Sequence, residues 1–247
     1  MYAVITAGGT VRPEFARAIG TDIKALAPLG DRRLIDPAID AARAVGARAI
    51  AVIGSPAVAQ YCAPRVECMV SAAPSGTENI LRALRAFPDA ERLVFLTSDL
   101  PFIEAAALAE FVARSRPAAL TMALAAADAY TAEFPGAPPH VVTLGGERFA
   151  NGSAFVIDRS AIAPLERLAG RFFSARKSLP RLALLLGPAL CLRFASGRLR
   201  LADIEHRASA VLGVAACAIV DAAPGLCYDV DDVADWAYAH SRQRADG

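Results

Sequence analysis

The chain has 247 residues, of which 55% are hydrophobic and 21% charged, and its formal net charge is +1. This composition excludes a largely disordered chain, and the nearly balanced charge argues against nucleic acid as a partner. The five cysteines form no C-x-x-C pair and the three histidines are scattered, so a zinc site is not expected. No signal peptide precedes the first apolar run, which favours reduced thiols and a cytoplasmic location.

The first 26 residues are the most informative segment. A strand expected over residues 2–6 runs into a loop that starts with Ala7, Gly8 and Gly9. Because glycine lacks a Cβ, backbone N–H groups can approach a ligand closely here, and phosphates suit such donors. The loop therefore predicts a phosphate-binding site.

Basic residues follow this loop at Arg12, Arg17 and Lys24. Lysine is rare in the chain, since Lys24 and Lys177 are the only two among 26 basic residues. Lysine is a compact, flexible point charge that arginine does not replace. Its use at these two positions indicates a functional role for the lysine side chain rather than a contribution to solubility.

Strands and helices then alternate up to residue 115. Apolar runs predict strands over 49–53 and 93–97, and apolar residues at helical spacing predict helices over 35–45, 80–87 and 108–112. Gly46 is expected to end the first of these helices, and Thr77 to cap the second. The long connections exclude hairpins, so we expect an α/β fold with a parallel sheet covered on both faces.

The second half is expected to form a mixed sheet. Residues 119–125 and 141–144 are predicted strands, and 134–139 is a proline-rich loop. No low-complexity linker and no internal repeat occurs. We therefore expect a single domain over residues 1–247, with halves at 1–115 and 116–247.

The apolar segment Leu182–Leu192 has two interpretations. It is too short to span a bilayer, which takes ~20 residues, and Gly187-Pro188 would interrupt a helix. We favour a pair of core or interface helices and expect no transmembrane segment. The alternative is a homodimer face or a lipid-contacting lid, because Arg181 and Arg193 flank the segment.

An acidic residue follows the strand predicted at 93–97. Ligands of an open parallel sheet bind at the carboxyl ends of its strands, so Asp99 should project into that crevice. A carboxylate there suits Mg²⁺, which takes one or two carboxylates together with phosphate oxygens and water. Alternatively, Asp99 or Ser98 caps the helix that follows.

A second acidic cluster lies near the end of the chain. Asp229 and Asp231 alternate with a valine along an extended segment, so both lie on one side of it and could complete a metal site with Asp99. Asp232 and Asp235 are expected at the start of a final helix, where negative charge is favourable.

Together, Ala7-Gly8-Gly9 with Lys24, Ser98-Asp99-Leu100-Pro101 and Asp229-Val230-Asp231-Asp232 resemble the MobA-like NTP transferases, over nearly the whole chain. Residues 134–136, 151–153, 173–178 and 197–204 are also similar to a bacterial branch of that group. The resemblance implies the nucleotide-diphospho-sugar transferase (GT-A-like) fold, a three-layer α/β/α arrangement with a mostly parallel mixed sheet. It implies an NTP-binding half at 1–115 and an acceptor-binding half at 116–247.

The same resemblance implies a Mg²⁺-dependent nucleotidyltransferase, which moves NMP from an NTP to a small phosphorylated acceptor and releases pyrophosphate. The implied nucleotide-binding residues are Ala7, Gly8, Gly9, Ser75, Gly76 and Thr77. The implied catalytic residues are Lys24, Arg12 and Asp99, with Arg17 an alternative to Arg12. The implied metal ligands are Asp99 and Asp231, beside Asp229, and the implied acceptor-binding residues are Asn151, Gly152 and Lys177.

The chain departs from the family pattern at two places. The usual A-G-G-x-G-x-R loop lacks its third glycine here, because Thr10-Val11-Arg12 follows the glycine pair, and Ile23 replaces the proline before Lys24. A non-catalytic nucleotide-binding protein is therefore one alternative. Another is a sugar-nucleotide-dependent glycosyltransferase of the same fold, although its D-x-D would fall where the chain has Thr97-Ser98-Asp99. Neither the base nor the acceptor follows from the sequence.

Overall fold

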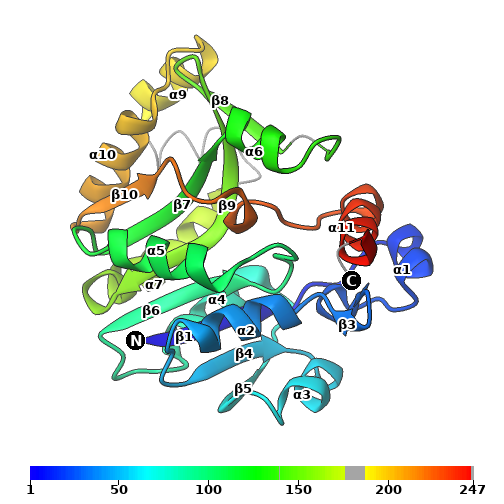
Figure 1. Cartoon of the computed structure of the whole chain (residues 1–247). Coiled ribbons are helices and arrows are strands. Elements are labelled where there is room, and N and C mark those ends of the chain that lie inside the picture. Colours follow the sequence, from blue (N-terminus) through cyan, green and yellow to red (C-terminus); the bar gives the residue numbers. More distant parts are fainter. Residues whose placement is uncertain (139, 176–186, 246–247) are drawn as a thin grey trace.

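The computed structural model describes residues 1–138, 140–175 and 187–245. These residues form a mixed sheet of eight strands, in the order β10-β7-β9-β6-β1-β4-β5, with β8 paired to β9 (Figure 1). These strands are β1 (Tyr2–Ala7), β4 (Ile50–Gly54), β5 (Cys68–Ser71), β6 (Arg92–Thr97), β7 (Leu120–Ala126), β8 (Val141–Leu144), β9 (Glu147–Asp158) and β10 (Ala216–Ile219).

Helices cover both faces of the sheet, which confirms the three-layer α/β/α class (Figure 1). One face carries α2 (Asp36–Ala44), α3 (Pro56–Cys62), α5 (Ala105–Arg114) and α6 (Ala127–Glu133). The other carries α4 (Gly76–Arg85), α7 (Arg159–Ala175) and α10 (Leu201–Leu212). Three further helices, α1 (Pro13–Ile19), α9 (Pro188–Ala195) and α11 (Val233–Ala245), lie toward the periphery, where α11 contacts α1 and the short strand β2 (Pro28–Leu29) (Figure 1).

The first half of the sheet is parallel, as predicted. β1 pairs in parallel with β4 on one side and β6 on the other. Ala3 and Ile5 face one helical layer and Val4 the other, and all three are fully buried. Burial on both faces explains why these strands are continuous apolar runs rather than alternating ones.

Two helix boundaries test the sequence signals for starts and stops. Gly46 follows α2 with a φ of +76°, a conformation that glycine adopts without strain, so the predicted stop is confirmed. The predicted Thr77 cap is wrong. α4 already begins at Gly76, so Ser75 takes the N-cap position and Thr77 lies inside the first turn.

The second half is organised by β9, which was not predicted as a strand. It pairs antiparallel with β6 on one side and with β7 on the other, while β10 pairs in parallel with β7. The expected strands at 119–125 and 141–144 are present as β7 and β8, so the mixed sheet is confirmed. A bulge between Met122 and Leu124 interrupts the β7–β9 register.

The apolar segment at 182–192 is only partly described, because residues 182–186 lie outside the described residues. Its described end belongs to α9, which buries none of its side chains. Leu192 is 72% exposed and the following Phe194 is 67% exposed. The predicted core position is therefore wrong for this end of the segment, and the interface position stays a prediction. Among the described helices, none has the length and apolar character needed to cross a membrane.

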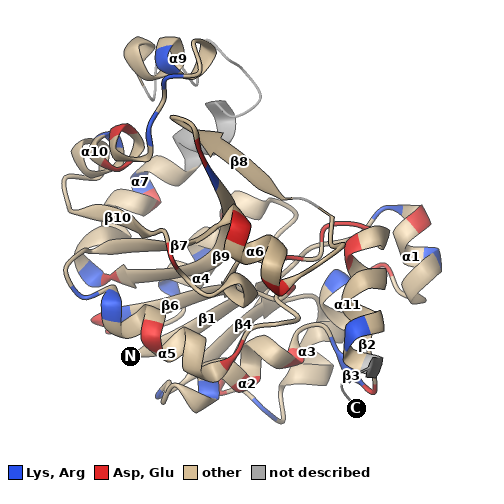
Figure 2. Cartoon of the chain, turned by 45° about the horizontal axis from the view of Figure 1, so that its top comes forward, with Lys and Arg blue, Asp and Glu red and all other residues tan. Residues whose placement is uncertain are grey.

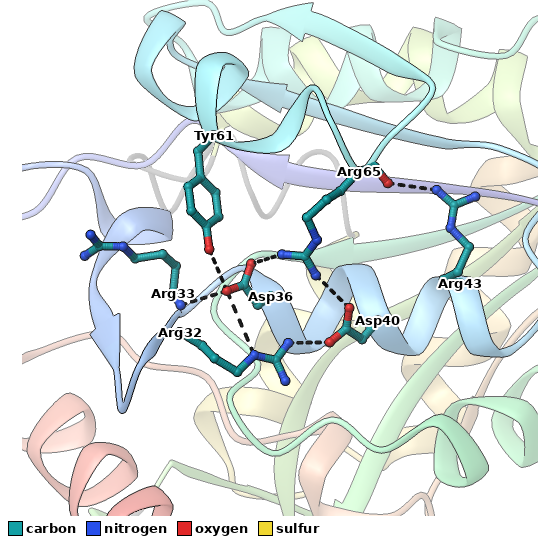
Figure 3. Close-up of polar contacts among 7 residues, drawn as sticks. All are labelled: Arg32, Arg33, Asp36, Asp40, Arg43, Tyr61 and Arg65. Carbon is teal, nitrogen blue, oxygen red and sulfur yellow. Dashed lines mark hydrogen bonds and ion pairs between the residues drawn. The ribbon is translucent and has the colours of Figure 1, made fainter.

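Charged residues of both signs are interspersed along the helices and strands in Figure 2. One cluster of them, with a buried aspartate at its centre and partly exposed partners, joins α2 to the segment between α3 and β5 (Figure 3). Its centre is Asp36, only 2% exposed, whose Oδ1 is paired with Arg65 and whose Oδ2 accepts hydrogen bonds from the Tyr61 hydroxyl and the Arg33 N–H, both at 2.8 Å. Arg65 also reaches Asp40 at 2.7 Å. Both oxygens of the buried carboxylate thus have partners.

Candidate active site

The segment after β1 folds back and returns the chain to the carboxyl end of that strand. Thr10 and Ile23 form an isolated antiparallel bridge, and the Lys24 N–H donates to the Gly9 carbonyl at 3.2 Å. The helix between these residues, α1, starts with a proline at its first turn, where no N–H is needed. These contacts bring Lys24, at the start of a 3₁₀ turn (Lys24–Leu26), next to the glycine pair.

Lys24 is the centre of a cluster of charged groups. Its Nζ lies 2.5 Å from Asp99 Oδ2 and 2.9 Å from Asp231 Oδ1. The side chains of Lys24 and Asp99 are 16% and 11% exposed, whereas that of Asp231 is 61% exposed. Burial lowers the pKa of Lys24, but the two carboxylates raise it by more, so the pKa is raised overall and the ammonium keeps its charge.

Neighbouring strands explain why residues so distant in sequence meet here. Because β1 and β6 are adjacent and parallel, their carboxyl ends coincide, and the Ser98 N–H donates to the Thr6 carbonyl at 3.1 Å. The Val230 N–H then donates to the Asp99 carbonyl at 3.0 Å, which holds the segment with Asp229 and Asp231 beside the end of β6. The predicted convergence of the two acidic clusters is therefore observed.

Asp99 does not cap the helix that follows it. That helix, α5, begins at Ala105, and its N-cap residue is Glu104. One oxygen of Asp99 pairs with Lys24, while the other, Oδ1, is buried and has no hydrogen-bond partner among the described residues. A buried carboxylate oxygen without a partner is costly, so this atom is available to a ligand.

Asp229 lies in the same cluster of like charges. Burial, together with the neighbouring Asp99 and Asp231 carboxylates, raises the pKa of Asp229 to about 6. The Ser153 hydroxyl of β9 donates to Asp229 Oδ2 at 3.4 Å, so β9 also reaches the site. Sequence reasoning included Ser153 only as part of a similar segment, and no pattern pointed to this contact.

The carboxylates suit a divalent cation by their chemistry. Asp99, Asp229 and Asp231 are hard oxygen donors of the type that Mg²⁺ binds, and Asp99 Oδ1 has no competing partner within the described residues. In this structure the Lys24 ammonium lies between two of them. No three acidic, histidine or cysteine side chains of the described residues are already arranged around a common metal position. Substrate oxygens and water would therefore complete the coordination.

The segment at 73–79 approaches the glycine loop from α4. The buried Asn79 side chain accepts from the Ala73 N–H at 2.6 Å and donates to the Ala73 carbonyl at 3.1 Å. A Cβ on Gly8 would lie 2.6 Å from Asn79 Nδ2, so only glycine fits against this fixed amide. Ser75, Gly76 and Thr77 therefore belong to a segment that is held next to the glycine loop.

The other predicted site residues are less tightly grouped. Arg12 is exposed at the N-cap of α1, and the exposed Arg17 donates from Nε to the Pro13 carbonyl of its own helix at 3.3 Å. Asn151 is exposed on β9. Gly152 is buried against β7, where a Cβ would lie 2.2 Å from the Ala123 carbonyl oxygen, so close strand packing explains this glycine.

Lys177, the remaining predicted acceptor-binding residue, lies outside the described residues. Asp232 and Asp235 have the structural role expected of them at the start of α11. Asp232 Oδ1 accepts from the Ala234 and Asp235 N–H groups, and Asp235 Oδ2 accepts from the Asp231 and Asp232 N–H groups. The turn that carries Asp231 is thus built by its own acidic residues.

Comparisons with known proteins agree with this architecture. A family model described as the MobA-like NTP transferase domain matches residues 3–183. A structure of a hypothetical transferase from Thermus thermophilus is 27% identical with a TM-score of 0.82, covering 95% of this chain and 99% of that chain. No curated protein matches the sequence significantly.

Two more distant structures share the fold. CMP:2-keto-3-deoxy-manno-octonic acid synthetase, complexed with CTP, is 14% identical with a TM-score of 0.58, covering 100% of this chain and 99% of that chain. The 2-C-methyl-D-erythritol 4-phosphate cytidylyltransferase of Thermus thermophilus is 13% identical with a TM-score of 0.52, and 98% of each chain is covered.

Proposed function

The chain belongs to the MobA-like NTP transferase family and is thus a nucleotidyltransferase, and we propose that it moves NMP from an NTP to a small phosphorylated acceptor, with Mg²⁺ and with release of pyrophosphate. The observation that carries this proposal is the contact of Lys24 with both Asp99 and Asp231 at the carboxyl ends of β1 and β6. Ligands of such sheets bind at this edge.

The glycine loop and the segment beside it would hold the nucleotide. Backbone N–H groups of Gly8 and Gly9, after Ala7, would face the phosphates. The base or ribose would lie along Ser75, Gly76 and Thr77, because Asn79 and Gly8 hold that segment against the loop.

Lys24 would stabilise the charge that develops on the phosphates. An ammonium has three N–H donors, and its contacts with Asp99 and Asp231 use two of them. The third would reach a phosphate oxygen without loss of the two ion pairs. Arg12 or Arg17, at the N-cap and in the last turn of α1, would add a second positive charge. Removal of one such donor typically costs ~10²–10³ in rate.

Asp99, Asp229 and Asp231 would hold Mg²⁺ together with phosphate oxygens. When bound, the ion would neutralise charge on the phosphates and on the leaving pyrophosphate. Burial, together with the neighbouring Asp99 and Asp231 carboxylates, raises the pKa of Asp229, and a divalent cation would relieve this excess of negative charge.

In the reaction, an oxygen of the acceptor phosphate would attack the α-phosphorus of the NTP. A new P–O bond forms there as the bond to the β-phosphate's bridging oxygen breaks, and pyrophosphate leaves. A phosphate acceptor is already anionic at neutral pH, so no protein base is required. On the acceptor side we propose the exposed Asn151 and, beyond the described residues, Lys177, with Gly152 serving strand packing.

The first test is a thermal-shift titration of the wild-type protein with each of the four NTPs, with and without Mg²⁺. A ligand at ~100 times its Kd adds about 2.7 kcal/mol to the free energy of unfolding, which is readily measured. One NTP should stabilise the protein in the presence of Mg²⁺, and Asp99→Asn should lose this effect. Asp89→Asn is the matched control, because Asp89 is exposed in the turn before β6, whereas Asp99 follows the same strand.

Each alternative gives a different result. Stabilisation by sugar nucleotides and by no NTP would replace the proposal with glycosyl transfer. NTP binding without pyrophosphate release, across a panel of phosphorylated acceptors, would favour a non-catalytic nucleotide-binding protein. No response to any nucleotide would contradict the proposed site.

A further inference from the structure

A histidine that the proposed reaction does not use is linked to the site through a buried carboxylate. His140 precedes β8, and its Nε2 lies 2.7 Å from Asp235 Oδ1 in the first turn of α11. The Asp235 side chain is fully buried, at 0% exposure. A fully buried carboxylate needs hydrogen-bond donors on its oxygens, and His140 supplies the one on Oδ1.

The other oxygen of Asp235 holds the backbone of the acidic turn. Oδ2 accepts from the N–H of Asp231 at 2.9 Å and from the N–H of Asp232 at 3.0 Å. The Tyr228 hydroxyl donates to the Asp235 carbonyl at 3.0 Å, which fixes the other end of the same turn. One carboxylate therefore connects the imidazole to the backbone that carries Asp231.

The position of the Asp231 carboxylate depends on this backbone. It is 61% exposed, so packing restricts it little, yet its Oδ1 meets Lys24 at 2.9 Å. We propose that His140 and Asp235 are positioning residues, which hold the 228–235 turn so that Asp231 contacts Lys24. Through them the segment before β8, in the second half, is connected to Lys24 in the first half. The effect on nucleotide binding, but not the positioning itself, rests on the proposed function.

Removal of the imidazole would leave Asp235 Oδ1 without its donor. In His140→Ala the carboxylate must turn toward other donors or admit water, and either change loosens its hold on the Asp231 and Asp232 N–H groups. His140→Gln keeps an N–H donor on a side chain of similar reach. The glutamine variant should therefore behave like the wild type, whereas the alanine variant should not.

The scarcity of lysine provides a direct measurement. Lys24 and Lys177 are the only lysines, so labelling with an amine reagent, followed by peptide mass spectrometry, reports on Lys24 with Lys177 as an internal reference. An ammonium held by two carboxylates is labelled slowly, because only the neutral amine reacts. The labelling rate of Lys24 in Asp231→Asn is the reference for a lost Lys24–Asp231 ion pair. The loss of a partly exposed ion pair corresponds to roughly a two- to fivefold faster reaction.

His140→Ala should accelerate labelling of Lys24 to near the Asp231→Asn rate and leave Lys177 unchanged, and His140→Gln should restore the wild-type rate. The control is His206→Ala, an exposed histidine on α10. Wild-type labelling of Lys24 in His140→Ala would overturn the proposal, as would a wild-type rate in Asp231→Asn. Equally fast labelling of Lys24 in His140→Gln would also overturn it, because an N–H donor to Asp235 Oδ1 would then not be sufficient to position Asp231.

A second readout connects the pair to the nucleotide. In His140→Ala the affinity for the NTP that stabilises the wild type should fall about two- to fivefold, as for loss of a partly exposed ion pair, with recovery in His140→Gln. Unchanged affinity would count against the positioning role. If no NTP binds the wild type, the proposed function fails, but the labelling experiment still decides the positioning of Asp231.

Discussion

Two buried aspartates, each paired with a cation, have opposite surroundings in this molecule. Asp36 is 2% exposed, and both of its oxygens have partners, namely Arg65 on Oδ1 and the Tyr61 hydroxyl and Arg33 N–H on Oδ2 (Figure 3). Asp99 is 8% exposed, and only its Oδ2 has a partner, Lys24, among the described residues.

The charge balance differs as well. Asp36 and Asp40 face the guanidinium groups of Arg65 and Arg32, so the Asp36 network is balanced. Around Lys24, the carboxylates of Asp99 and Asp231 contact one ammonium, and burial together with these like charges raises the pKa of the neighbouring Asp229. A buried carboxylate with complete partners serves the fold, whereas one with an unpaired oxygen and like-charged neighbours is suited to a ligand.

The largest effect on stability should come from Asp36→Ala. This change leaves the Tyr61 hydroxyl and the Arg33 N–H without their acceptor and removes one of the two partners of Arg65, and each hydrogen bond to a charged group contributes about 1.5–3 kcal/mol, so a loss of about 3–5 kcal/mol is expected. Urea denaturation would measure the free energy of unfolding. Asp40→Ala is the control, because Asp40 is 52% exposed and should contribute less than about 1 kcal/mol. Equal losses in the two variants would remove the distinction between the networks.

Replacement of the cation in each network, Arg65 or Lys24, with methionine should separate the two networks further. Arg65→Met and Lys24→Met should each lower the free energy of unfolding by about 2 kcal/mol, because charged hydrogen bonds are lost. Millimolar Mg²⁺ should restore stability in Lys24→Met, where a divalent cation can replace the ammonium between the carboxylates, and not in Arg65→Met. Denaturation with and without Mg²⁺ is the measurement. Rescue of both variants, or of neither, would contradict a cation site at Asp99.

The smallest expected effect concerns His140. Burial lowers its pKa, but the hydrogen bond to Asp235 and the nearby Asp229 and Asp231 carboxylates raise it by more, so the folded-state pKa lies above that of the unfolded chain. The stabilisation from protonated His140 is then fully present below pH ~6.5 and is lost as the pH rises through the folded-state value.

This contribution should be below about 1 kcal/mol, because His140 is partly exposed. It would be measured as the difference in unfolding free energy between the wild type and His140→Gln from pH 5.5 to pH 9. The difference should shrink with rising pH. A constant difference, or one that grows, would contradict the sign derived from the Asp235 contact.

Local patterns were sufficient for the three central strands of the parallel half, whereas β5, which pairs with β4, was not predicted. β1, β4 and β6 are apolar runs buried on both faces, and α2 ends where Gly46 permits a positive φ. β9 could not be identified in this way, because its partners β6 and β7 lie earlier in the chain and its Asn151-Gly152 step is typical of a turn. Only the tertiary contact with the Ala123 carbonyl explains that glycine.

The proximity of Lys24, Asp99 and Asp231 was predictable, because strand ends and family motifs marked these positions. His140 was not, because its partner Asp235 is 95 residues away and no local pattern links a lone histidine to a helix start. Ser153 was missed for the same reason, since its contact with Asp229 depends on how β9 is placed in the sheet.

The position of β9 has a consequence for the order in which the chain can fold. During synthesis both β6 and β7 leave the ribosome before the strand that separates them. Until residues 147–158 follow, each presents an unpaired edge, and the two could pair directly with each other in a non-native arrangement. The sheet therefore closes late, by insertion of β9, and the nascent chain is most exposed to misfolding and to chaperone capture just before that strand emerges.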